Sequence, residues 1–261
     1  MSGSFLALGY LSIFGKEPKI VNLDLEDEGL ETELNPYIFI DSDGKITLFN
    51  NRPEIGQGTY EAIPMIIAEE LEVDIANINI MPSPADRAKY GDQMVVGSRS
   101  IQSNYNLMRR VGASAKEMLI TAAAAKWNIP AEKCYAENAI VINRNSGAKF
   151  SYGDLVADAK KLKAPENPIL KDPKDFTIIG KSFPRRDIPL KVNGETKFGI
   201  DIKVPGMLYA SIERSPVILG KLVRFNDEKA KAVKGVKYVL KTQREVFGQE
   251  KMLYTFSNYW D

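Results

Sequence analysis

The spacing of apolar residues divides the first part of the chain into a hairpin and a helix. Tyr37–Ile40 and Lys45–Phe49 are β-rich, and the turn sequence Asp-Ser-Asp-Gly between them predicts a β-hairpin. Tyr60–Glu72 instead has helical spacing, with apolar residues on one face at Ile63, Ile66, Ile67 and Leu71. Thr59 directly precedes this helix, and its hydroxyl is expected to cap the first turn.

Further along the chain, the pattern adds a strand, a longer helix and a small β-rich region. Ile78–Met81 reads as a strand, and Ile101–Trp127 is a helical stretch without proline. Pro130 ends this second helix near Asn128. The region that follows is expected to contain two strands and a short helix, at Ala139–Asn143, Lys149–Phe150 and Ser151–Lys160.

A Pro-rich stretch at Ala164–Asp175 separates this region from a second unit rich in valine, isoleucine, tyrosine and glycine. In the second unit, strands are expected at Lys191–Glu195, Phe198–Val204, Met207–Arg214 and Val236–Leu240, with a helix at Asn226–Ala232. The predicted organisation is a leader and acidic linker, a first domain, a Pro-rich linker and a second domain, at residues 1–34, 35–160, 161–190 and 191–261. The predicted fold class is α+β, a mixed α/β architecture.

Composition excludes several classes of chemistry. The 261 residues are 44% hydrophobic and 26% charged, which is typical of a globular protein. The net charge of +1 gives no general attraction to nucleic acid. The absence of histidine excludes histidine-based triads and zincin motifs within this chain. The single cysteine, Cys134, cannot form an internal disulfide or hold an iron–sulfur cluster, and it is expected to be a packed, inert thiol.

Two polar, glycine-containing loops at helix starts supply the candidate cofactor-binding residues. The first loop consists of Gly56, Gln57 and Gly58. The second consists of Gly97, Ser98, Arg99 and Ser100. A turn from a strand into a helix presents backbone N–H groups to an anion, and hydroxyls with an arginine fork can clamp a phosphate. Taken alone, the first loop also fits an ordinary turn, and the second also fits an N-cap serine with a solvated arginine.

Other charged residues near these loops are expected to be structural. Glu54 has no histidine to pair with as a base, so it is interpreted as a solvated charge or a charge at the helix N-terminus. Arg109 and Arg110 lie inside the second helix and are expected on the surface. No residue is assigned a catalytic or metal-binding role.

Three ordered blocks of sequence carry a family resemblance. They are EIGQGTYEAIPMIIAEELEVD, GSRSIQSNYNLMRRVGASAKEMLITAAAAKWNIPAEKCYAENAIV and PLKVNGETKFGIDIKVPGMLYASIERSPV. Over about residues 35–260, the chain resembles the start of a molybdopterin-binding large subunit of the xanthine dehydrogenase and aldehyde oxidase family. Within that family, the resemblance is closest to isoquinoline 1-oxidoreductase beta subunits.

This resemblance implies a cofactor, an activity and partners. Blocks like the first two contribute to the pocket for a molybdenum-molybdopterin cofactor, including its cytosine dinucleotide form. The third opens an aldehyde oxidase/xanthine dehydrogenase a/b hammerhead domain. The complete enzyme would hydroxylate a small aromatic N-heterocycle or an aldehyde with oxygen from water. It would then pass electrons to a small 2Fe-2S subunit.

Two features of the family are missing from this sequence. These are a Gly-rich loop of the Gly-Gly-Gly-Phe-Gly type and a C-terminal glutamate that acts as the base. The chain therefore resembles the N-terminal portion of a longer large subunit, and by itself it is expected to bind no cofactor or to bind it poorly. The alternative hypothesis is a non-catalytic binding or assembly module that keeps the fold without the active-site glutamate.

The N-terminus contains a short apolar run, Phe5–Phe14, followed by the acidic stretch Asn22–Leu34. The run is too short to cross a bilayer as a helix, and it fits both a signal h-region and a helix docked on the core. The family resemblance implies a twin-arginine leader, although the arginine pair is absent here. The expected destination of the natural protein is periplasmic or membrane-associated, and otherwise cytoplasmic.

Deletion of residues 1–20 tests the leader hypothesis. We expect the melting temperature to stay unchanged, because the spacer between the apolar run and the first strand far exceeds an ordinary connection of about 4–6 residues. Thermal unfolding of the shortened and complete chains measures this. A fall of many degrees would assign the apolar run to the fold.

Overall fold

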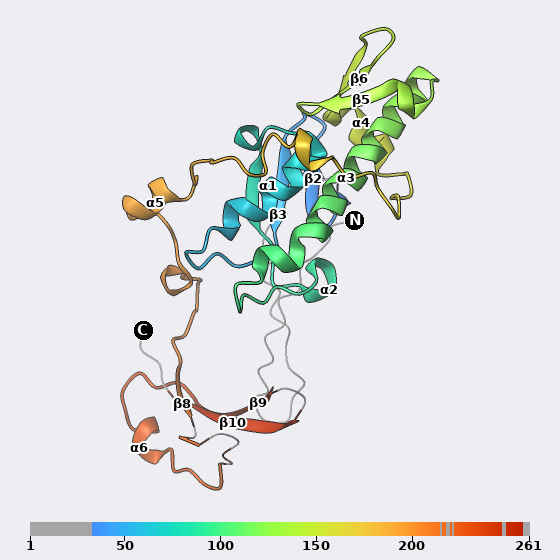
Figure 1. Cartoon of the computed structure of the whole chain (residues 1–261). Coiled ribbons are helices and arrows are strands. Elements are labelled where there is room, and N and C mark those ends of the chain that lie inside the picture. Colours follow the sequence, from blue (N-terminus) through green and yellow to red (C-terminus); the bar gives the residue numbers. More distant parts are fainter. Residues whose placement is uncertain (1–32, 215, 218–219, 221, 247–248, 258–261) are drawn as a thin grey trace. The chain divides into compact units, whose positions relative to one another are not determined.

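The computed structural model describes residues 33–257 except 215, 218–219, 221 and 247–248 (Figure 1). The apolar run Phe5–Phe14 lies outside the described residues. The chain forms two compact units with their boundary between Ile188 and Pro189. Helices and strands are mixed in an α+β fold, as predicted. None of the helices described is long and apolar enough to cross a membrane.

The first unit contains a four-stranded sheet in the order β1 (Glu33–Asn35), β2 (Ile38–Ile40), β3 (Ile46–Asn50) and β4 (Asn79–Pro82). The first three strands are antiparallel, and the predicted hairpin is confirmed as β2 and β3. Strand β4 is parallel to β3, so the chain must cross over between them. That crossover contains α1 (Thr59–Leu71) and η1 (Ile75–Asn77).

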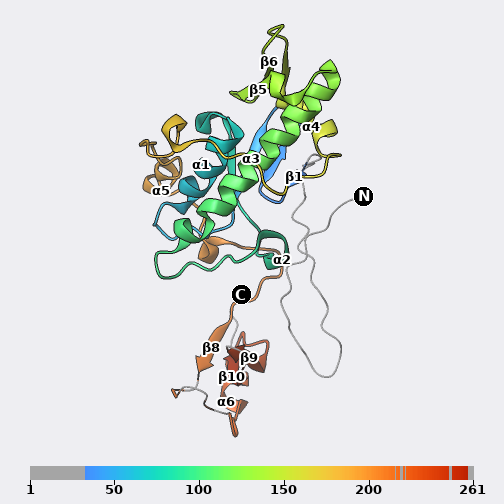
Figure 2. The same cartoon turned by 45° about the vertical axis from the view of Figure 1, so that its right-hand side comes forward.

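Two helices cover this sheet in successive layers. Helix α1 contacts β3 and β4, and α3 (Ser100–Trp127) packs across α1 (Figures 1 and 2). Both helices confirm the sequence prediction. Between them and the sheet lies a core of fully buried side chains, which includes Ile38, Leu48, Ile63, Ile67, Leu71, Met108 and Leu119. The short helix α2 (Arg87–Tyr90) precedes α3.

A glycine sets the distance between α1 and α3. A Cβ placed on Gly112 would lie 2.5 Å from the backbone oxygen of Ile67 and 2.9 Å from Cβ of Glu70. No side-chain rotation relieves an overlap with a backbone atom. The helices therefore approach closely because position 112 carries no side chain.

The remaining part of the first unit is a small antiparallel sheet with one helix. Its strands are β5 (Cys134–Glu137), β6 (Ile140–Asn143) and β7 (Lys149–Ser151), preceded by η2 (Ala131–Lys133). Helix α4 (Tyr152–Ala159) begins with a capping box between Ser151 and Asp154. Cys134 is buried, so the prediction of a packed thiol is confirmed, and burial raises the pKa of that thiol, which disfavours the reactive thiolate.

Residues 166–187, which we call the strap, bind along α1 through three of that helix's buried glutamates. Residues 161–190 are predicted from sequence to be a Pro-rich linker, and the strap, which contains η3 (Pro173–Asp175), makes up most of that range. The Glu69 carboxylate accepts hydrogen bonds from the backbone N–H groups of Thr177, Ile178 and Ile179. It also accepts one from Nζ of Lys171 at 2.8 Å.

The other two glutamates hold the strap on either side of Glu69. Glu70 accepts from the backbone N–H of Lys171 at 2.9 Å and from Nε of Arg109 at 2.6 Å. Glu61 accepts from Nε of Arg186 at 2.8 Å. Buried carboxylates are tolerated only when they are paired and hydrogen-bonded. The strap is therefore a structural part of the first unit.

The second unit differs from the sequence prediction at its start. Strands were expected at Lys191–Glu195 and Phe198–Val204, and this prediction is wrong. The structure instead has the helices α5 (Ile188–Val192) and η4 (Gly199–Asp201) in these regions. Strand propensity is realised only where a residue packs against neighbouring strands, and Ile200 is 88% exposed.

Further along, the second unit forms a three-stranded sheet in the order β8 (Ser211–Arg214), β10 (Gln249–Ser257) and β9 (Val239–Val246). Strand β8 covers only the end of the predicted Met207–Arg214. The predicted helix at Asn226–Ala232 is present in shorter form as α6 (Glu228–Lys231).

Gly112→Ala should destabilise the first unit. The added methyl group must displace the backbone of α1, and overpacking of this kind costs about 1–3 kcal/mol. Ser114→Ala, two residues further along α3, is the control and should change the free energy of unfolding by less than about 0.5 kcal/mol. Urea unfolding of both variants measures the difference. Equal stabilities would mean that the helices can separate without cost.

Glu69→Gln should release the strap. The neutral amide removes the charge that pairs with Lys171 and leaves some of the donating N–H groups without an acceptor, a loss of about 3 kcal/mol. Glu132→Gln, which alters an exposed glutamate, provides the control. Amide hydrogen exchange should rise over residues 171–179 in the first variant only. Protection that stays unchanged there would contradict the role of Glu69.

Candidate functional site

A cluster of buried polar residues at the end of β3 connects the two predicted loops. Arg52 is only 4% exposed, and its Nη1 donates to Oδ2 of Asp92 at 3.1 Å and to the backbone oxygen of Met94 at 2.5 Å. These contacts fix the segment that leads into Gly97. Arg52 is also the residue that leads, through Pro53, into the first loop. The Arg52 side chain therefore connects the segments that precede the two loops.

Asn51 extends this connection to the beginning of α3. Its Nδ2 donates to the backbone oxygen of Tyr90 and to Oδ1 of Asn104, both at 3.3 Å. Asn104 in turn donates from Nδ2 to the backbone oxygen of Ser100 at 2.7 Å. The structure thus brings the two loops to one place through buried intermediates. In the described part of the chain, no hydrogen bond joins the loops directly.

The first loop is shaped by the carboxylate of Glu54. Oε1 accepts from the backbone N–H groups of Gly56 at 2.7 Å and Gly58 at 3.1 Å, and Oε2 accepts from that of Tyr60 at 2.9 Å. Gly58, in a left-handed conformation with φ 88°, is the N-cap residue of α1. The expectation that Thr59 caps this helix is therefore wrong, because Glu54 supplies the acceptor.

Charge and hydrogen bonds keep Glu54 ionised. Burial raises the pKa of this carboxyl, but the hydrogen bonds from Tyr60, Gly58 and Gly56 and the charge of Arg185 lower it further, so the net pKa lies below the ordinary 4.5. Of the two roles considered for Glu54, the structure assigns the charge at the helix N-terminus.

Gln57 is exposed at the tip of the first loop and bonds to its own backbone. Oε1 accepts from the N–H of Ile55 at 2.6 Å, and Nε2 donates to the oxygen of Pro53 at 2.8 Å. The amide group therefore stabilises the turn as it stands. A cofactor contact by this side chain requires it to exchange one of these bonds.

The second loop carries free donors at the N-terminus of the longest described helix. Gly97 and Ser98 both adopt left-handed conformations, with φ 60° and φ 56°. Arg99 is the N-cap residue of α3 and provides no side-chain cap. In the part of the chain that the structure describes, the exposed side chains of Ser98 and Arg99 form no hydrogen bond or ion pair. Ser100, by contrast, is buried.

The buried cluster also contains polar atoms that lack partners. Nε of Arg52 and Oδ1 of Asn51 are buried without a hydrogen bond among the described residues. Nε of Arg52 is a donor and Oδ1 of Asn51 an acceptor, and neither is exposed. The donors that could bind anionic oxygens are Ser98, Arg99 and the uncapped start of α3. This donor set is suited to a phosphate or another anionic group. Among the described residues, no group of three or more acidic or cysteine side chains is arranged to hold a metal ion.

Sequence reasoning missed Asn51, Arg52 and Asn104. A signal was present for the first two, because a polar Asn-Asn-Arg run follows directly on an apolar strand.

Arg109 was expected on the surface, and that prediction is wrong. It is 8% exposed, pairs with Glu70 and lies 5.0 Å over the ring of Phe176. Arg110 is exposed, as predicted.

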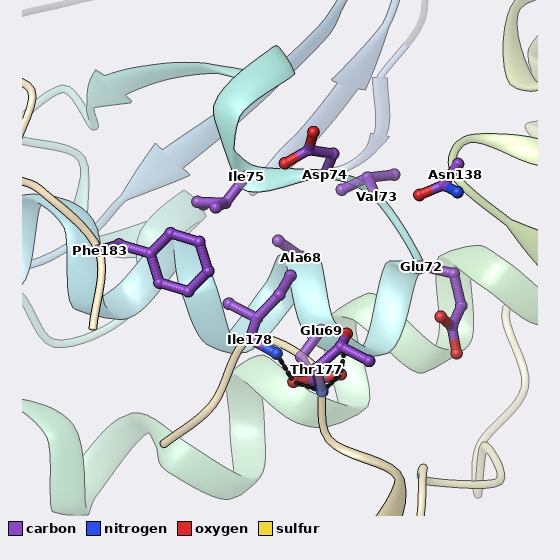
Figure 3. A pocket seen from close by; sticks show the side chains of 10 residues that line it. All are labelled: Ala68, Glu69, Glu72, Val73, Asp74, Ile75, Asn138, Thr177, Ile178 and Phe183. Atoms are coloured by element: carbon purple, nitrogen blue, oxygen red, sulfur yellow. Dashed lines mark hydrogen bonds between the residues drawn. The ribbon is translucent and has the colours of Figure 1, made fainter. Parts of the chain in front are cut away.

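A pocket of about 210 Å³ lies elsewhere, beside the C-terminal end of α1 (Figure 3). It contains none of the predicted binding residues. Its lining residues are Ala68, Glu69, Glu72, Val73, Asp74, Ile75, Asn138, Thr177, Ile178 and Phe183. The Glu69 carboxylate is occupied by Thr177 and Ile178, and Asp74 caps η1. The pocket is a gap beneath the strap whose acidic groups serve the fold.

Comparisons with known proteins identify the family of this chain. The profile of the molybdopterin cofactor-binding domain family matches residues 21–190. The beta chain of isoquinoline 1-oxidoreductase from Brevundimonas diminuta is 30% identical over 245 residues, which cover 79% of this chain and 31% of that protein. One of the subunits of nicotinate dehydrogenase from Pseudomonas putida is 29% identical over 187 residues, covering 71% and 16%.

A third relative is the membrane-bound aldehyde dehydrogenase (pyrroloquinoline-quinone) of Gluconacetobacter polyoxogenes. It is 34% identical over 206 residues, which cover 76% of this chain and 26% of that protein. The chain thus spans at most 31% of the length of these relatives. Because the family profile matches more than half of the sequence, the chain belongs to the molybdopterin cofactor-binding domain family of the molybdenum hydroxylases.

Proposed function

We propose that this chain forms one wall of the molybdenum-cofactor site in the large subunit of a molybdenum hydroxylase. The observation that carries the proposal is the uncapped N-terminus of α3, where Ser98 and Arg99 are exposed and without partners in the described part of the chain. Helix N-termini with an arginine favour phosphate, because the backbone N–H groups and the guanidinium donate to the same anion.

Each loop has a distinct task in this proposal. Arg99 and Ser98 bind phosphate oxygens, while Gly97 gives the turn its left-handed backbone. Gly56, Gln57 and Gly58 lie against the pterin or its dinucleotide extension, where the amide of Gln57 both donates and accepts. Arg52 holds the approach to the second loop, and Ser100 is buried behind it. A cytosine dinucleotide form of the cofactor would present further phosphate to the same donors.

The names of the relatives support an oxidative role and a range of substrates. Two are named for isoquinoline and nicotinate, which are N-heterocycles, and one for aldehydes. When bound, the molybdenum cofactor supplies the redox chemistry for hydroxylation with oxygen from water. The residues of this chain bind and orient it. An N-heterocycle or an aldehyde is the substrate class that we infer for the complete enzyme.

Electron transfer requires a partner in this proposal. The chain has one cysteine, Cys134, which is buried, whereas a 2Fe-2S cluster takes four ligands, usually cysteines. We infer that a separate small 2Fe-2S subunit accepts the electrons. The names of two relatives, which call them subunits, support an assembly of several chains. The second unit, residues 189–261, corresponds in this proposal to a hammerhead domain.

The cellular location remains part of the same proposal. The apolar run Phe5–Phe14 before an acidic stretch supports a leader, and the resemblance to enzymes with twin-arginine leaders supports a periplasmic or membrane-associated destination. Export after folding would suit a protein that carries a bound cofactor.

Arg99→Ala tests the cofactor site. In the complete large subunit assembled with its partner, we expect the affinity for the molybdenum cofactor to fall about ten- to a hundredfold, because a charge-assisted hydrogen bond is lost. Arg224→Ala is the control, since it removes an exposed arginine that forms no hydrogen bond or ion pair among the described residues. Molybdenum and pterin per subunit, measured after dialysis, report the loading.

Equal cofactor loading of the two variants would mean that Arg99 is a solvated arginine that does not bind the cofactor. A complete wild-type subunit that carries no molybdenum would instead favour the non-catalytic binding or assembly module.

A further inference from the structure

An arginine of the strap reaches the first loop from a distant part of the sequence. Nη2 of Arg185 lies 3.3 Å from Oε1 of Glu54. The same guanidinium forms a two-point contact with Asp187, from Nε to Oδ1 at 3.0 Å and from Nη2 to Oδ2 at 2.6 Å. Arg185 is thus oriented by Asp187 while it contacts the carboxylate that shapes the loop.

Glu54 connects this arginine to the backbone of the loop. The three N–H groups that its carboxylate accepts come from Gly56, Gly58 and Tyr60, and its side chain is 13% exposed. Gly56 and Gly58 have left-handed φ angles of 103° and 88°. A fixed acceptor between two such glycines selects one conformation from the many that glycine allows. The loop therefore has its shape because Glu54 is ionised and held in place.

The positively charged guanidinium of Arg185 also lies close to the backbone of the loop. A Cβ built on Gly58 would lie 4.0 Å from Nη1 of Arg185. Glu61, Glu69 and Glu70 hold the strap along α1. These contacts therefore fix the position of Arg185 beside the first loop. Arg186, the next residue, is itself bound to Glu61.

We propose that Glu54 and Arg185 are positioning residues that hold the Gly56-Gln57-Gly58 loop in the conformation that receives the cofactor. Neither side chain needs to touch the cofactor. Glu54 acts through the backbone N–H groups of the loop, and Arg185 acts through Glu54. The strap is accordingly part of the cofactor site. This inference rests on the proposed function, because it assumes that the loop faces the cofactor.

The experiment compares Glu54→Gln, Arg185→Ala and Arg185→Lys in the complete assembled subunit, with Glu132→Gln and Arg224→Ala, which alter exposed residues away from the strap, as controls. Amide hydrogen exchange is measured over residues 55–60, and molybdenum retention is measured in the same samples. In Glu54→Gln and Arg185→Ala we expect exchange in the loop to accelerate about tenfold, and cofactor to be lost faster by a similar factor. Arg185→Lys keeps the charge and should restore part of both properties.

A titration gives a readout that packing alone would not change. The pKa of Glu54 lies below 4.5, so its ionised form holds the loop at and above that pH and releases it as the pH falls through the lowered pKa. The carboxyl-carbon NMR shift of Glu54 should report a higher midpoint in Arg185→Ala than in the wild type. An unchanged midpoint would exclude an electrostatic action of Arg185.

The possible outcomes separate this inference from the proposed function. Unchanged exchange over residues 55–60 in Glu54→Gln and Arg185→Ala would overturn the positioning role. Faster exchange with unchanged molybdenum retention would overturn it too, because the loop would then be shaped by these residues without serving the cofactor. The proposed function itself depends on Arg99→Ala, whose result is independent of either finding.

Discussion

The first unit depends on the burial of three carboxylates along α1. An amphipathic helix between a sheet and a second helix normally turns a solvated face outward, but Glu61, Glu69 and Glu70 are all buried. Burial of a charge is unfavourable unless donors surround it. The donors come from Arg109 on α3 and from the strap, more than a hundred residues later for most of these contacts. The segment after α4 is therefore required for α1 to pack as it does.

The same arrangement organises the candidate site. One end of the strap brings Arg185 to Glu54, and Glu54 fixes the loop at the start of α1. On the other side, Arg52 fixes the approach to the loop at the start of α3. Contacts from other parts of the first unit thus anchor both loops, an arrangement that suits the cofactor-binding role that we propose. In the first loop the N–H groups of Gly56 and Gly58 donate to Glu54, while the second loop offers free donors, and this difference supports the proposal that the second loop binds phosphate.

Periodicity in the sequence was sufficient to predict the hairpin, α1 and α3, because each has a long or regular apolar pattern. It could not reveal that Glu61, Glu69 and Glu70 are buried, since a glutamate on a helix looks solvated until its distant partners are known. Arg109 was misplaced for the same reason. In the second unit, the prediction of strands at Lys191–Glu195 and Phe198–Val204 was wrong because β-rich composition does not specify a pairing partner. The two loops were found by glycine and charge, but Asn51 and Arg52, which join them, were not.

The contacts of the strap also have a consequence for the order of folding. Glu69 bonds to residues 108–110 positions later in the chain, and Glu61 bonds to one 125 positions later. Contacts at such separation form late, because closing a long loop costs entropy before the contact is made. During synthesis, α1 leaves the ribosome well before Arg186 does, so Glu61 and Glu69 lack their strap partners in the meantime. We expect α1 and α3 to associate loosely at first. Water would be excluded from the packed faces of α1 only after the strap has bound.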